Sequence, residues 1–475
     1  MNSSAKFRVA IIGGGIGGLT FAVSLNKNCK NVVVDLYESA AAFTEVGAGI
    51  GVWPRVWEIY QELGLRDDLL AIASDSEQTR SVPTARVLEY RKADQTEGID
   101  FHGNTQRIRF TSFHRAEFQA ALVRHLPQSY NIYFSKRLKS YTETPSGEMV
   151  LEFLDGSTAA CDILVGCDGI KSAVRSVLYH SLVKEAELAG DIAQAACFRR
   201  EAIPQWSGYI AYRALFPRDR LEAACPGHPA LTRSLLVCYI SLHAGRTDKS
   251  LSQCFGKNKH IVIYPVSQEH FINIVAFVAD FKSQGAIYPE PWVRESGKEE
   301  LAALFSNWEP DVQILFNCLD KVSAWVINTL PSLHTYAGSR VALVGDAAHA
   351  MEPHQGSGAG QAAEDAFILA TILGHPSVTK ETLANALLIY DEIRRPFSQQ
   401  IVEKSRLTGI HYDLHCPGIE NVTERASAQG AISTRQLEAI GKKLDDLITW
   451  AGTSSIMDDR DRALELLEAG LKAQV

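Results

Sequence analysis

A chain of 475 residues is too long for a single compact core, so two or three domains are expected. The net charge of −8 argues against binding to nucleic acid or to the surface of an anionic membrane. No stretch reaches the roughly eighteen apolar residues of a membrane span, and no signal peptide is evident, which predicts a cytoplasmic protein.

The N-terminal segment predicts a right-handed βαβ unit. Arg8–Ile12 and Asn31–Tyr37 are short apolar runs typical of buried strands, and Gly13-x-Gly15-x-x-Gly18 leads into a helical pattern between them. The first glycine allows a tight turn, the second lets the backbone approach a pyrophosphate, and the third lets the helix pack on the strand. Exposed N–H groups and the helix dipole then favour an anion, so we predict a dinucleotide site at this turn.

Glu38 follows the second strand, where a carboxylate is placed to accept hydrogen bonds from ribose hydroxyls. An acidic side chain there would repel the extra phosphate of NADP, which is therefore not expected at this site. The turn alone leaves NAD and FAD both open, and a purely structural glycine turn is the alternative.

The middle of the chain predicts an inserted antiparallel sheet. Met149–Leu154 is a predicted strand that ends at the Asp155–Gly156 turn, and Ile163–Gly166 is the next. From Asp191 to Asp280 the pattern changes to β, with apolar runs at 208–216, 234–241, 259–266 and 270–278. Arg340–Val344 is again a buried strand, a long helix covers 360–373, and the pattern beyond about residue 400 is mainly helical.

Two further segments carry a more specific signal. CDGIKSAVR at 167–175 follows one predicted strand and GDAAH at 345–349 follows another. Together with the glycine turn they resemble the fingerprints of the single-component, class A FAD-dependent aromatic hydroxylases, and within them salicylate hydroxylase and related fungal phenol and benzoate monooxygenases. The resemblance covers roughly residues 7–400 and includes EVGAGIGVWPR at 45–55, HRAEF at 114–118, PHQGSGAGQAAEDA at 353–366 and YDEIRRP at 390–396.

The resemblance implies an α/β fold of the para-hydroxybenzoate hydroxylase type. A Rossmann-type FAD-binding domain would carry an inserted antiparallel β-sheet substrate domain and a helical C-terminal region. The expected division is FAD-binding residues 1–185 and 286–400, a substrate-binding sheet at 186–285 and a C-terminal helical region at 401–475. No second strand–GxGxxG–helix unit occurs, so NADH or NADPH is expected to visit the protein as a transient co-substrate while FAD stays bound.

The resemblance also assigns roles around the cofactor. Asp346 would accept hydrogen bonds from the ribityl hydroxyls, the alternative being a simple cap of the following turn. The glycine-rich loop before the long helix would bring N–H groups to the pyrimidine edge of the isoalloxazine. Arg115 would contact the pyrophosphate or ribityl region, and Asp168 would serve the hinge between FAD and nicotinamide handling. The residues expected to hold FAD are Gly13, Gly15, Gly18, Glu38, Gly47, Ala48, Gly49, Arg115, Asp168, Asp346, Gly356, Gly358, Ala359 and Gly360.

Candidate substrate residues follow from strand alternation. Tyr209, Ala211 and Arg213 share one face of their strand, with Tyr212 on the other. Arg213 would pair with a carboxylate or stabilise a phenolate, or else face solvent. On the strand at 259–266, His260, Val262 and Tyr264 share a face, and Tyr264 would donate to the substrate or only pack in the core. Tyr239, on a neighbouring strand, is a weaker candidate.

His354 directly precedes the glycine loop, so its imidazole should lie near both flavin and substrate. There it would relay the phenol proton. The alternative is a purely structural histidine. The expected catalytic residues are therefore His354, Arg213 and Tyr264, and the expected substrate-binding residues are Arg213, Tyr239, His260, Tyr264 and His354. The nine scattered cysteines form no Cys-x-x-Cys pair, and no metal site is expected.

These observations lead to ranked hypotheses for the function. The first is an FAD monooxygenase that uses NAD(P)H and O2 to hydroxylate a small phenolic acid, salicylate-like, with oxidative decarboxylation to a catechol or hydroquinone. The second is ring or dearomatising hydroxylation of a phenolic polyketide without decarboxylation. A flavin-bound interaction or sensor protein that lacks catalysis is the rival from another class. A monomer and a homodimer are both open.

Overall fold

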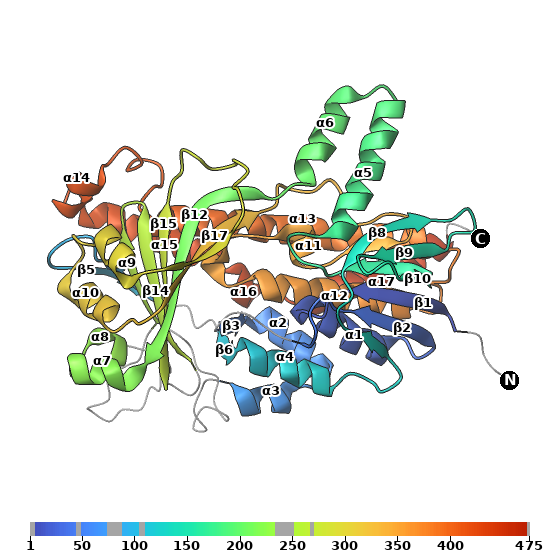
Figure 1. The fold of residues 1–475 in the computed structure, drawn as a ribbon, viewed down its shortest axis with the longest axis horizontal. Helices are drawn as coiled ribbons and strands as arrows, with labels where there is room; N and C mark the ends of the chain where they lie inside the picture. Colours follow the sequence, from blue (N-terminus) through green and yellow to red (C-terminus); the bar gives the residue numbers. More distant parts are fainter. Residues whose placement is uncertain are drawn as a thin grey trace.

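The computed structural model places two sheet-centred halves side by side along the long axis (Figure 1). It describes residues 5–43, 49–73, 88–103, 110–232, 251–266 and 270–472. Both chain ends lie at the same end of the molecule (Figure 1). Within the described ranges, no helix is both long and apolar enough to cross a membrane.

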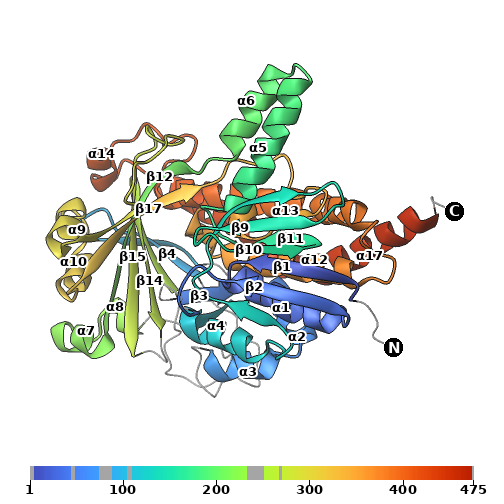
Figure 2. The same ribbon diagram turned by 45° about the vertical axis from the view of Figure 1, so that its right-hand side comes forward.

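A five-stranded parallel sheet forms the centre of one half (Figure 2). Its strands, in sheet order, are β18 (Val341–Leu343), β11 (Ile163–Gly166), β1 (Phe7–Ile12), β2 (Val32–Tyr37) and β7 (Asn131–Tyr133). The strands predicted near residues 8–12, 31–37, 163–166 and 340–344 are therefore confirmed. Because all five run parallel, their carboxyl ends share one edge, which is where α/β sheets bind ligands.

Helices cover the parallel sheet, and two of them begin at its carboxyl edge. α1 (Ile16–Asn28) follows β1 directly, and α12 (Gly358–Gly374) packs along it. The two-stranded sheet of β3 (Gly49–Val52) and β6 (Thr111–His114) lies beside α12 and α4. The other helices of this half are α2 (Pro54–Glu62), α3 (Arg66–Ile72), α4 (Arg115–Arg124) and the short α11 (Asp346–His349).

A three-stranded antiparallel sheet and a helical hairpin complete this half. The sheet consists of β8 (Leu138–Glu143), β9 (Met149–Phe153) and β10 (Thr158–Cys161), with the predicted turn at Asp155–Gly156 between the last two. After β11, α5 (Ala173–Leu188) and α6 (Ile192–Glu201) project from the body as a hairpin (Figure 1).

The prediction that the β pattern begins at Asp191 is wrong. Asp191 is the N-cap of α6, and its side chain accepts a hydrogen bond from the backbone N–H of Gln194. The cap and the alanine-rich first turns stabilise a helix at this point. Strand structure resumes only at Gln205, and the predicted strand at 234–241 lies outside the described residues.

The second half is built on an eight-stranded sheet that is antiparallel except for one pair, β13 and β4. In sheet order its strands are β16 (Val293–Ser296), β17 (Val322–Thr329), β12 (Gln205–Pro217), β15 (Phe271–Ala279), β14 (Lys259–Val266), β13 (Leu251–Gly256), β4 (Leu88–Lys92) and β5 (Ile99–Gly103). Strands from before residue 186 and after residue 285 thus join the sheet, and the division into domains at these residues stays a proposal.

Side chains of β12 point alternately to the two faces of the large sheet. Tyr212 and Ala214 lie in the apolar core beneath α7 (Arg218–Ala224), α8 (Pro229–Thr232), α9 (Lys298–Leu304) and α10 (Pro310–Asn317). Tyr209 and Ala211 belong to a separate cluster on the opposite face. The predicted alternation of this strand is confirmed, and it turns one face toward the other half of the molecule.

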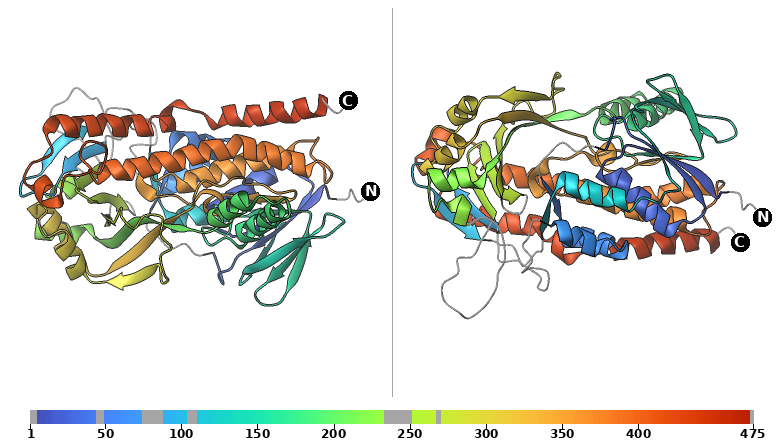
Figure 3. Two further views of the ribbon diagram at one scale, coloured as in Figure 1. Left: turned by 90° about the horizontal axis from the view of Figure 1, so that it is seen from above. Right: turned by 60° about the horizontal axis from the view of Figure 1, so that its bottom comes forward.

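C-terminal helices tie the two halves together. α13 (Leu383–Tyr412) runs beside α12, and the line of α15 (Thr434–Ile448), α16 (Trp450–Thr453) and α17 (Ile456–Lys472) runs alongside it (Figure 3). α15 contacts β5 of the large sheet, whereas α17 contacts α12 and α2 of the half that contains the parallel sheet. The short α14 (Glu424–Ala428) lies between α13 and α15 in the chain.

A buried network of charges joins these helices. The Arg394 guanidinium on α13 contacts Glu364 and Asp365 of α12, each at 2.9 Å, and donates to the Gln361 side-chain oxygen at 2.8 Å. Asp365 also accepts from the backbone N–H of Gly345 and from His349. Arg394 is fully buried and contacts both carboxylates, while Arg55 contacts Glu364 from the other side of the network at 3.0 Å, so removing Arg394 leaves Asp365 without an arginine and Glu364 with one.

Replacing Arg394 with methionine is expected to lower the free energy of unfolding by about 3–5 kcal/mol, because two buried carboxylates lose a cation. Replacing Arg406, a more exposed residue of the same helix that pairs with Glu403, should cost about 0–1 kcal/mol. Urea unfolding followed by tryptophan fluorescence measures both. Equal shifts for the two variants would show that the network does not stabilise the fold.

Candidate active site

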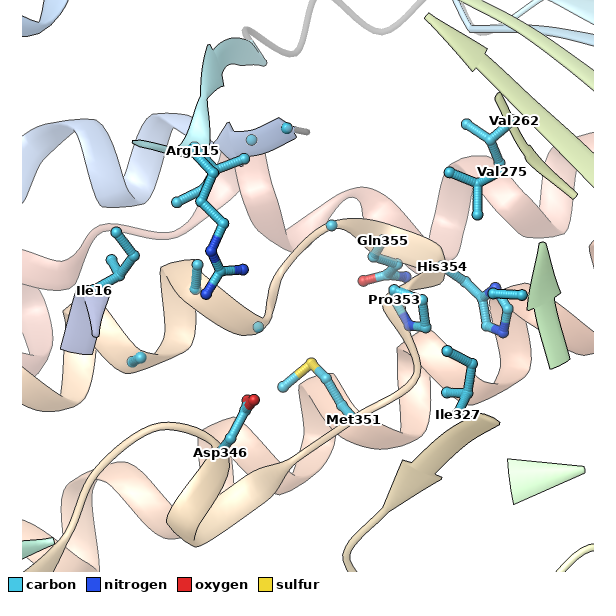
Figure 4. Close-up of a pocket in the computed structure, with 18 of the residues that line it drawn as sticks. Ile16, Arg115, Val262, Val275, Ile327, Asp346, Met351, Pro353, His354 and Gln355 are labelled. Carbon is cyan, nitrogen blue, oxygen red and sulfur yellow. The ribbon is translucent and has the colours of Figure 1, made fainter. Parts of the chain in front are cut away.

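A cavity of about 520 Å³ lies between the parallel sheet and the eight-stranded sheet. One end is bordered by the glycine turn after β1, the segment after β18 and the start of α12. The other end is bordered by strands β12, β14, β15 and β17 of the large sheet (Figure 4). Its size and its mixture of apolar walls with a few polar groups are typical of cofactor and substrate sites.

The glycine turn opens on the first end of the cavity. Gly13 has φ of +107°, and a Cβ there would lie 2.3 Å from the Cys167 carbonyl oxygen. A Cβ on Gly18 would lie 2.0 Å from the Gly13 carbonyl oxygen. These two glycines therefore permit close packing, while Gly15, together with Gly17, lines the cavity itself. The N-terminus of α1 has no side-chain cap, which leaves its N–H groups available to a pyrophosphate.

Glu38 lies just beyond the end of β2, next to the same turn. One carboxylate oxygen accepts a hydrogen bond from the Gly14 N–H at 2.8 Å, and the other accepts from the Ala40 N–H at 2.7 Å. These bonds fix the carboxylate beside the turn, in the place where a ribose is bound in dinucleotide folds.

A second helix N-terminus faces the cavity at the start of α12. Gly356 has φ of +62°, and Gly358 and Ala359 line the wall, while Ser357 makes no side-chain cap bond. Gly360 is not among the residues that line the cavity; its missing Cβ makes room for Val56 of α2, at 2.9 Å, and its predicted contact with FAD stays a proposal. Two helices, α1 and α12, thus begin at one cavity without a side-chain cap. The N–H groups and dipole of α1 suit a pyrophosphate, and those of α12 suit an electron-rich flavin edge.

Asp346 and Arg115 point into the cavity from opposite sides (Figure 4). Asp346 begins α11 at the end of β18, and the preceding Gly345 has φ of +65° and donates its N–H to the buried Asp365. The Asp346 carboxylate is thereby presented to the space between the two helix N-termini. Its position fits contacts with ribityl hydroxyls, and its expected role stays a proposal.

Asp168 accepts hydrogen bonds at the start of α5, and its predicted hinge role stays a proposal. Its carboxylate accepts from the Ser172 hydroxyl at 2.6 Å and from the N–H groups of Ala173 and Val174 at 2.7 and 3.2 Å. It caps the start of α5, and its neighbours Cys167 and Gly169 line the cavity in its place. Gly47, Ala48 and Tyr239 lie outside the described residues, while Gly49 lines the cavity.

Arg213 and Tyr264 lie together in the wall formed by the large sheet. The Arg213 guanidinium lies 5.3 Å from the centre of the Trp325 ring, and it has no carboxylate partner among the residues that the structure describes. Burial lowers the pKa of the Arg213 guanidinium. Burial also raises the pKa of the Tyr264 hydroxyl, although the nearby charge of Arg213 opposes this rise. A Cβ on Gly49 would lie 3.0 Å from the Tyr264 hydroxyl, so this tyrosine packs against the start of β3 in the half that contains the parallel sheet.

His354 lies at the same end of the cavity, within the short helix η2 (Pro353–Gln355), beside Ile327 (Figure 4). Its side chain is buried, and neither ring nitrogen has a hydrogen-bond partner in the described part of the chain. Burial lowers the pKa of His354, although Glu352 at 3.4 Å opposes the shift. A neutral imidazole with a free nitrogen is thus available to accept a proton at neutral pH.

His260 does not line the cavity but lies next to His354, with ring centres 5.0 Å apart. Several cavity residues were not predicted from the sequence, because they carry no local motif and reach the site only through the tertiary fold. The strand residues among them, Phe277 and Trp325, follow from the alternation rule once the sheet is known. Residues of this kind include Phe110, Gln253, Val275, Phe277, Trp325, Ile327 and Tyr412.

Comparison with known proteins supports the same assignment. A family model described as "FAD binding domain" matches residues 6–405. The FAD-dependent monooxygenase str9 of Strobilurus tenacellus is 35% identical, over 98% of this chain and 99% of its own. The chain belongs to this family of FAD-dependent monooxygenases. Salicylate hydroxylase of Pseudomonas putida is also 35% identical, over 88% of each chain. A solved salicylate hydroxylase substrate complex has a TM-score of 0.76 at 29% identity, covering 97% of this chain and 98% of that one.

The predicted family, its α/β fold with a helical C-terminal region and FAD as the cofactor are therefore confirmed. The residues at the cavity fit FAD, because two uncapped helix N-termini and the Asp346 carboxylate face one elongated space. The protein is an FAD-dependent aromatic monooxygenase of the salicylate hydroxylase family, in which NAD(P)H typically serves as co-substrate.

Proposed function

We propose that this monooxygenase hydroxylates a small phenolic acid, a salicylate-like hydroxybenzoate, and that it expels the carboxylate as carbon dioxide. The observation that carries the proposal is Arg213, a cation in the cavity wall that has no carboxylate partner among the described residues. A largely buried cation is stable only if something neutralises it, and an anionic substrate supplies that charge.

The proposed reaction balances with one reductant and one dioxygen. Salicylate, NAD(P)H, O2 and two protons give catechol, carbon dioxide, NAD(P)+ and water. Bound FAD supplies the transfer of electrons from NAD(P)H to dioxygen and the delivery of one oxygen atom to the ring. The protein must bind the acid, ionise its phenol and exclude water from the reacting centre.

The chain's own residues fit these tasks. Arg213 holds the carboxylate or the phenolate, and Tyr264 beside it donates a hydrogen bond to the same anion. His354 removes the phenol proton and thereby makes the ring carbon electron-rich. The apolar side chains of the large sheet keep the ring dry, among them Val262, Val275 and Phe277.

Hydroxylation without decarboxylation is the second candidate, and the apolar wall favours it for phenols that carry no carboxylate. Arg213 would then neutralise the phenolate alone. A fungal relative matched over 98% of this chain is described only as an FAD-dependent monooxygenase, which fits either candidate.

The test is NADH and NADPH oxidation with a panel of phenols and hydroxybenzoates, scored by oxygen uptake, product mass and released carbon dioxide. The proposal predicts that salicylate stimulates oxidation and releases carbon dioxide in proportion to product. Stimulation without carbon dioxide supports the second candidate. A lack of stimulation by every phenol would leave the flavin-bound sensor protein as the remaining hypothesis.

A further inference from the structure

A cluster of buried polar side chains surrounds His354. Tyr209 on β12, His260 on β14, Glu352 before η2 and Asp413 after α13 come from four separate segments, and their exposed fractions are 1%, 0%, 4% and 0%. None of these four residues lines the cavity. They connect with it through His354, whose ring centre lies 4.7 Å from that of Tyr209 and 5.0 Å from that of His260.

The cluster concentrates buried polar atoms that have no hydrogen-bond partner within the described ranges. Each such atom costs about 1–3 kcal/mol when left unsatisfied, so several in one place require an explanation. A polar space of this kind is where ordered water bridges side chains. The atoms are Tyr209 Oη, His260 Nε2, Glu352 Oε2, His354 Nδ1, His354 Nε2 and Asp413 Oδ2.

His260 and Asp413 form a directly bonded pair in this cluster. His260 Nδ1 and Asp413 Oδ1 are 2.8 Å apart, and the imidazole stacks on Phe277 with ring centres 4.5 Å apart. Burial lowers the pKa of His260 to about 3, so the ring is neutral and donates its Nδ1 proton to the carboxylate. One oxygen of Asp413 is thereby held, and the other is left to accept a proton.

Gly409 on α13 shows how closely the helix, His354 and Tyr209 are packed. A Cβ at this position would lie 2.4 Å from His354 Cδ2, 2.5 Å from His354 Nε2 and 3.0 Å from the Tyr209 hydroxyl. A side chain on Gly409 would therefore displace both groups. The backbone of α13 runs on from this contact to Asp413, one helical turn later.

We propose that Asp413, held by His260 and reached through Tyr209, receives the proton that His354 removes from the phenolic substrate. This inference rests on the proposed hydroxylation of a phenol. The phenol O–H bond breaks with its electron pair left on oxygen, and the proton passes to a ring nitrogen of His354. It then moves through the Tyr209 hydroxyl or water to Asp413, whose carboxylate becomes a neutral acid. Asp413 and Tyr209 act through His354 and are positioning residues.

The surroundings of Asp413 suit a proton acceptor. Burial raises the pKa of Asp413 to about 7, and the groups that oppose the shift are Tyr209, His354, His415 and Lys257. These groups and His260, which bonds Asp413 directly, come from β12, β14, η2 and the segments next to β14 and α13. Asp413 is therefore ionised just above neutral pH and gains a proton just below it.

His415 and Lys257 lie close enough to Asp413 to interact with it electrostatically. His415 follows two residues later, is only partly buried and stacks on Phe281 with ring centres 4.1 Å apart. Lys257 Nζ lies 3.5 Å from His415 Nδ1 and donates to the carbonyl oxygens of Leu414, Ile419 and Glu420. We expect the proton to leave Asp413 on the side of these two groups.

The test compares Tyr209→Phe and Asp413→Asn with wild-type holoenzyme. Tyr209→Phe keeps the aromatic ring, with its contacts to His260, Phe277 and His354, and removes only the hydroxyl, so this variant should fold normally. The substrates are salicylate, or whichever phenol the wild type hydroxylates best, and ring-fluorinated derivatives of increasing phenol acidity. Both variants should lower kcat for the parent phenol by about ten-fold or more. The defect should shrink along the series, because a phenol that ionises readily needs less help from a proton acceptor.

A second readout is the pH profile. Wild-type kcat should fall as pH drops through about 7, where Asp413 gains its proton, and Asp413→Asn should lose this inflection. Asp391→Asn removes another buried carboxylate of α13, one that bonds Arg395, and should retain both the inflection and the dependence on phenol acidity. An equal defect for every substrate, or no defect in either test variant, overturns the inference. A wild-type enzyme that hydroxylates no phenol overturns the proposed function as well.

Discussion

Replacing His354 with asparagine is expected to lower kcat by about 10²- to 10⁴-fold, the usual contribution of a positioned general base. The imidazole lines the substrate end of the cavity, is neutral because burial lowers its pKa, and has a nitrogen free of hydrogen bonds within the described residues. Asparagine keeps a polar group of similar size but cannot accept the proton. The KM for a carboxylated phenol should change less than about three-fold, because Arg213 carries most of the binding.

Steady-state hydroxylation rates measure this effect, with flavin content determined for each preparation. His411→Asn is the matched control, since His411 lies on α13, bonds only the Leu407 carbonyl among the described groups and does not line the cavity. It should retain wild-type kcat. A His354→Asn variant that turns over at the wild-type rate would show that this histidine is merely structural.

Replacing Arg213 with glutamine is expected to weaken salicylate binding by about 10- to 100-fold. The estimate follows from a hydrogen bond to a charged group, worth about 1.5–3 kcal/mol. Arg213 is the cation of the substrate wall, and no described carboxylate competes for it. Titration of the flavin absorbance spectrum with salicylate gives the Kd of each variant.

Unsubstituted phenol distinguishes the two roles considered for this arginine. If Arg213 binds the carboxylate, phenol should bind the variant and the wild type equally well, whereas a loss for both ligands indicates contact with the phenolate. Arg294→Gln is the control, because Arg294 lies on β16 of the same sheet, pairs with Glu300 of α9 and does not line the cavity. An unchanged salicylate Kd in Arg213→Gln would contradict the proposed binding mode.

The sequence was informative where function depends on local backbone geometry. Gly13, Gly15 and Gly18 could be placed because a strand, a turn and a helix follow one another within one segment. Strand alternation likewise put Arg213 and Tyr212 on opposite faces of β12, and Tyr212 indeed packs in the core beneath the outer helices. Such rules use only neighbours in the chain and hold before any tertiary contact is known.

Local rules are less informative where tertiary contacts determine the surroundings of a residue. Gly360 belongs to the loop predicted to hold FAD, and its missing Cβ also makes room for Val56 of α2. Asp168, predicted to serve a hinge, accepts hydrogen bonds at the start of α5. Tyr412 and Asp413 carry no motif: because α13 spans both halves of the fold, Tyr412 lines the cavity and Asp413 joins the buried cluster around His354.

The central claim is that this protein inserts an oxygen atom from O2 into a carboxylated phenol and releases its carboxylate. Its most direct test supplies heavy-isotope oxygen gas and salicylate labelled at the carboxyl carbon to the holoenzyme with NADH or NADPH. The account predicts catechol with one heavy oxygen atom and an equal amount of labelled carbon dioxide. Nicotinamide oxidation that yields only hydrogen peroxide, with neither labelled product, would contradict it.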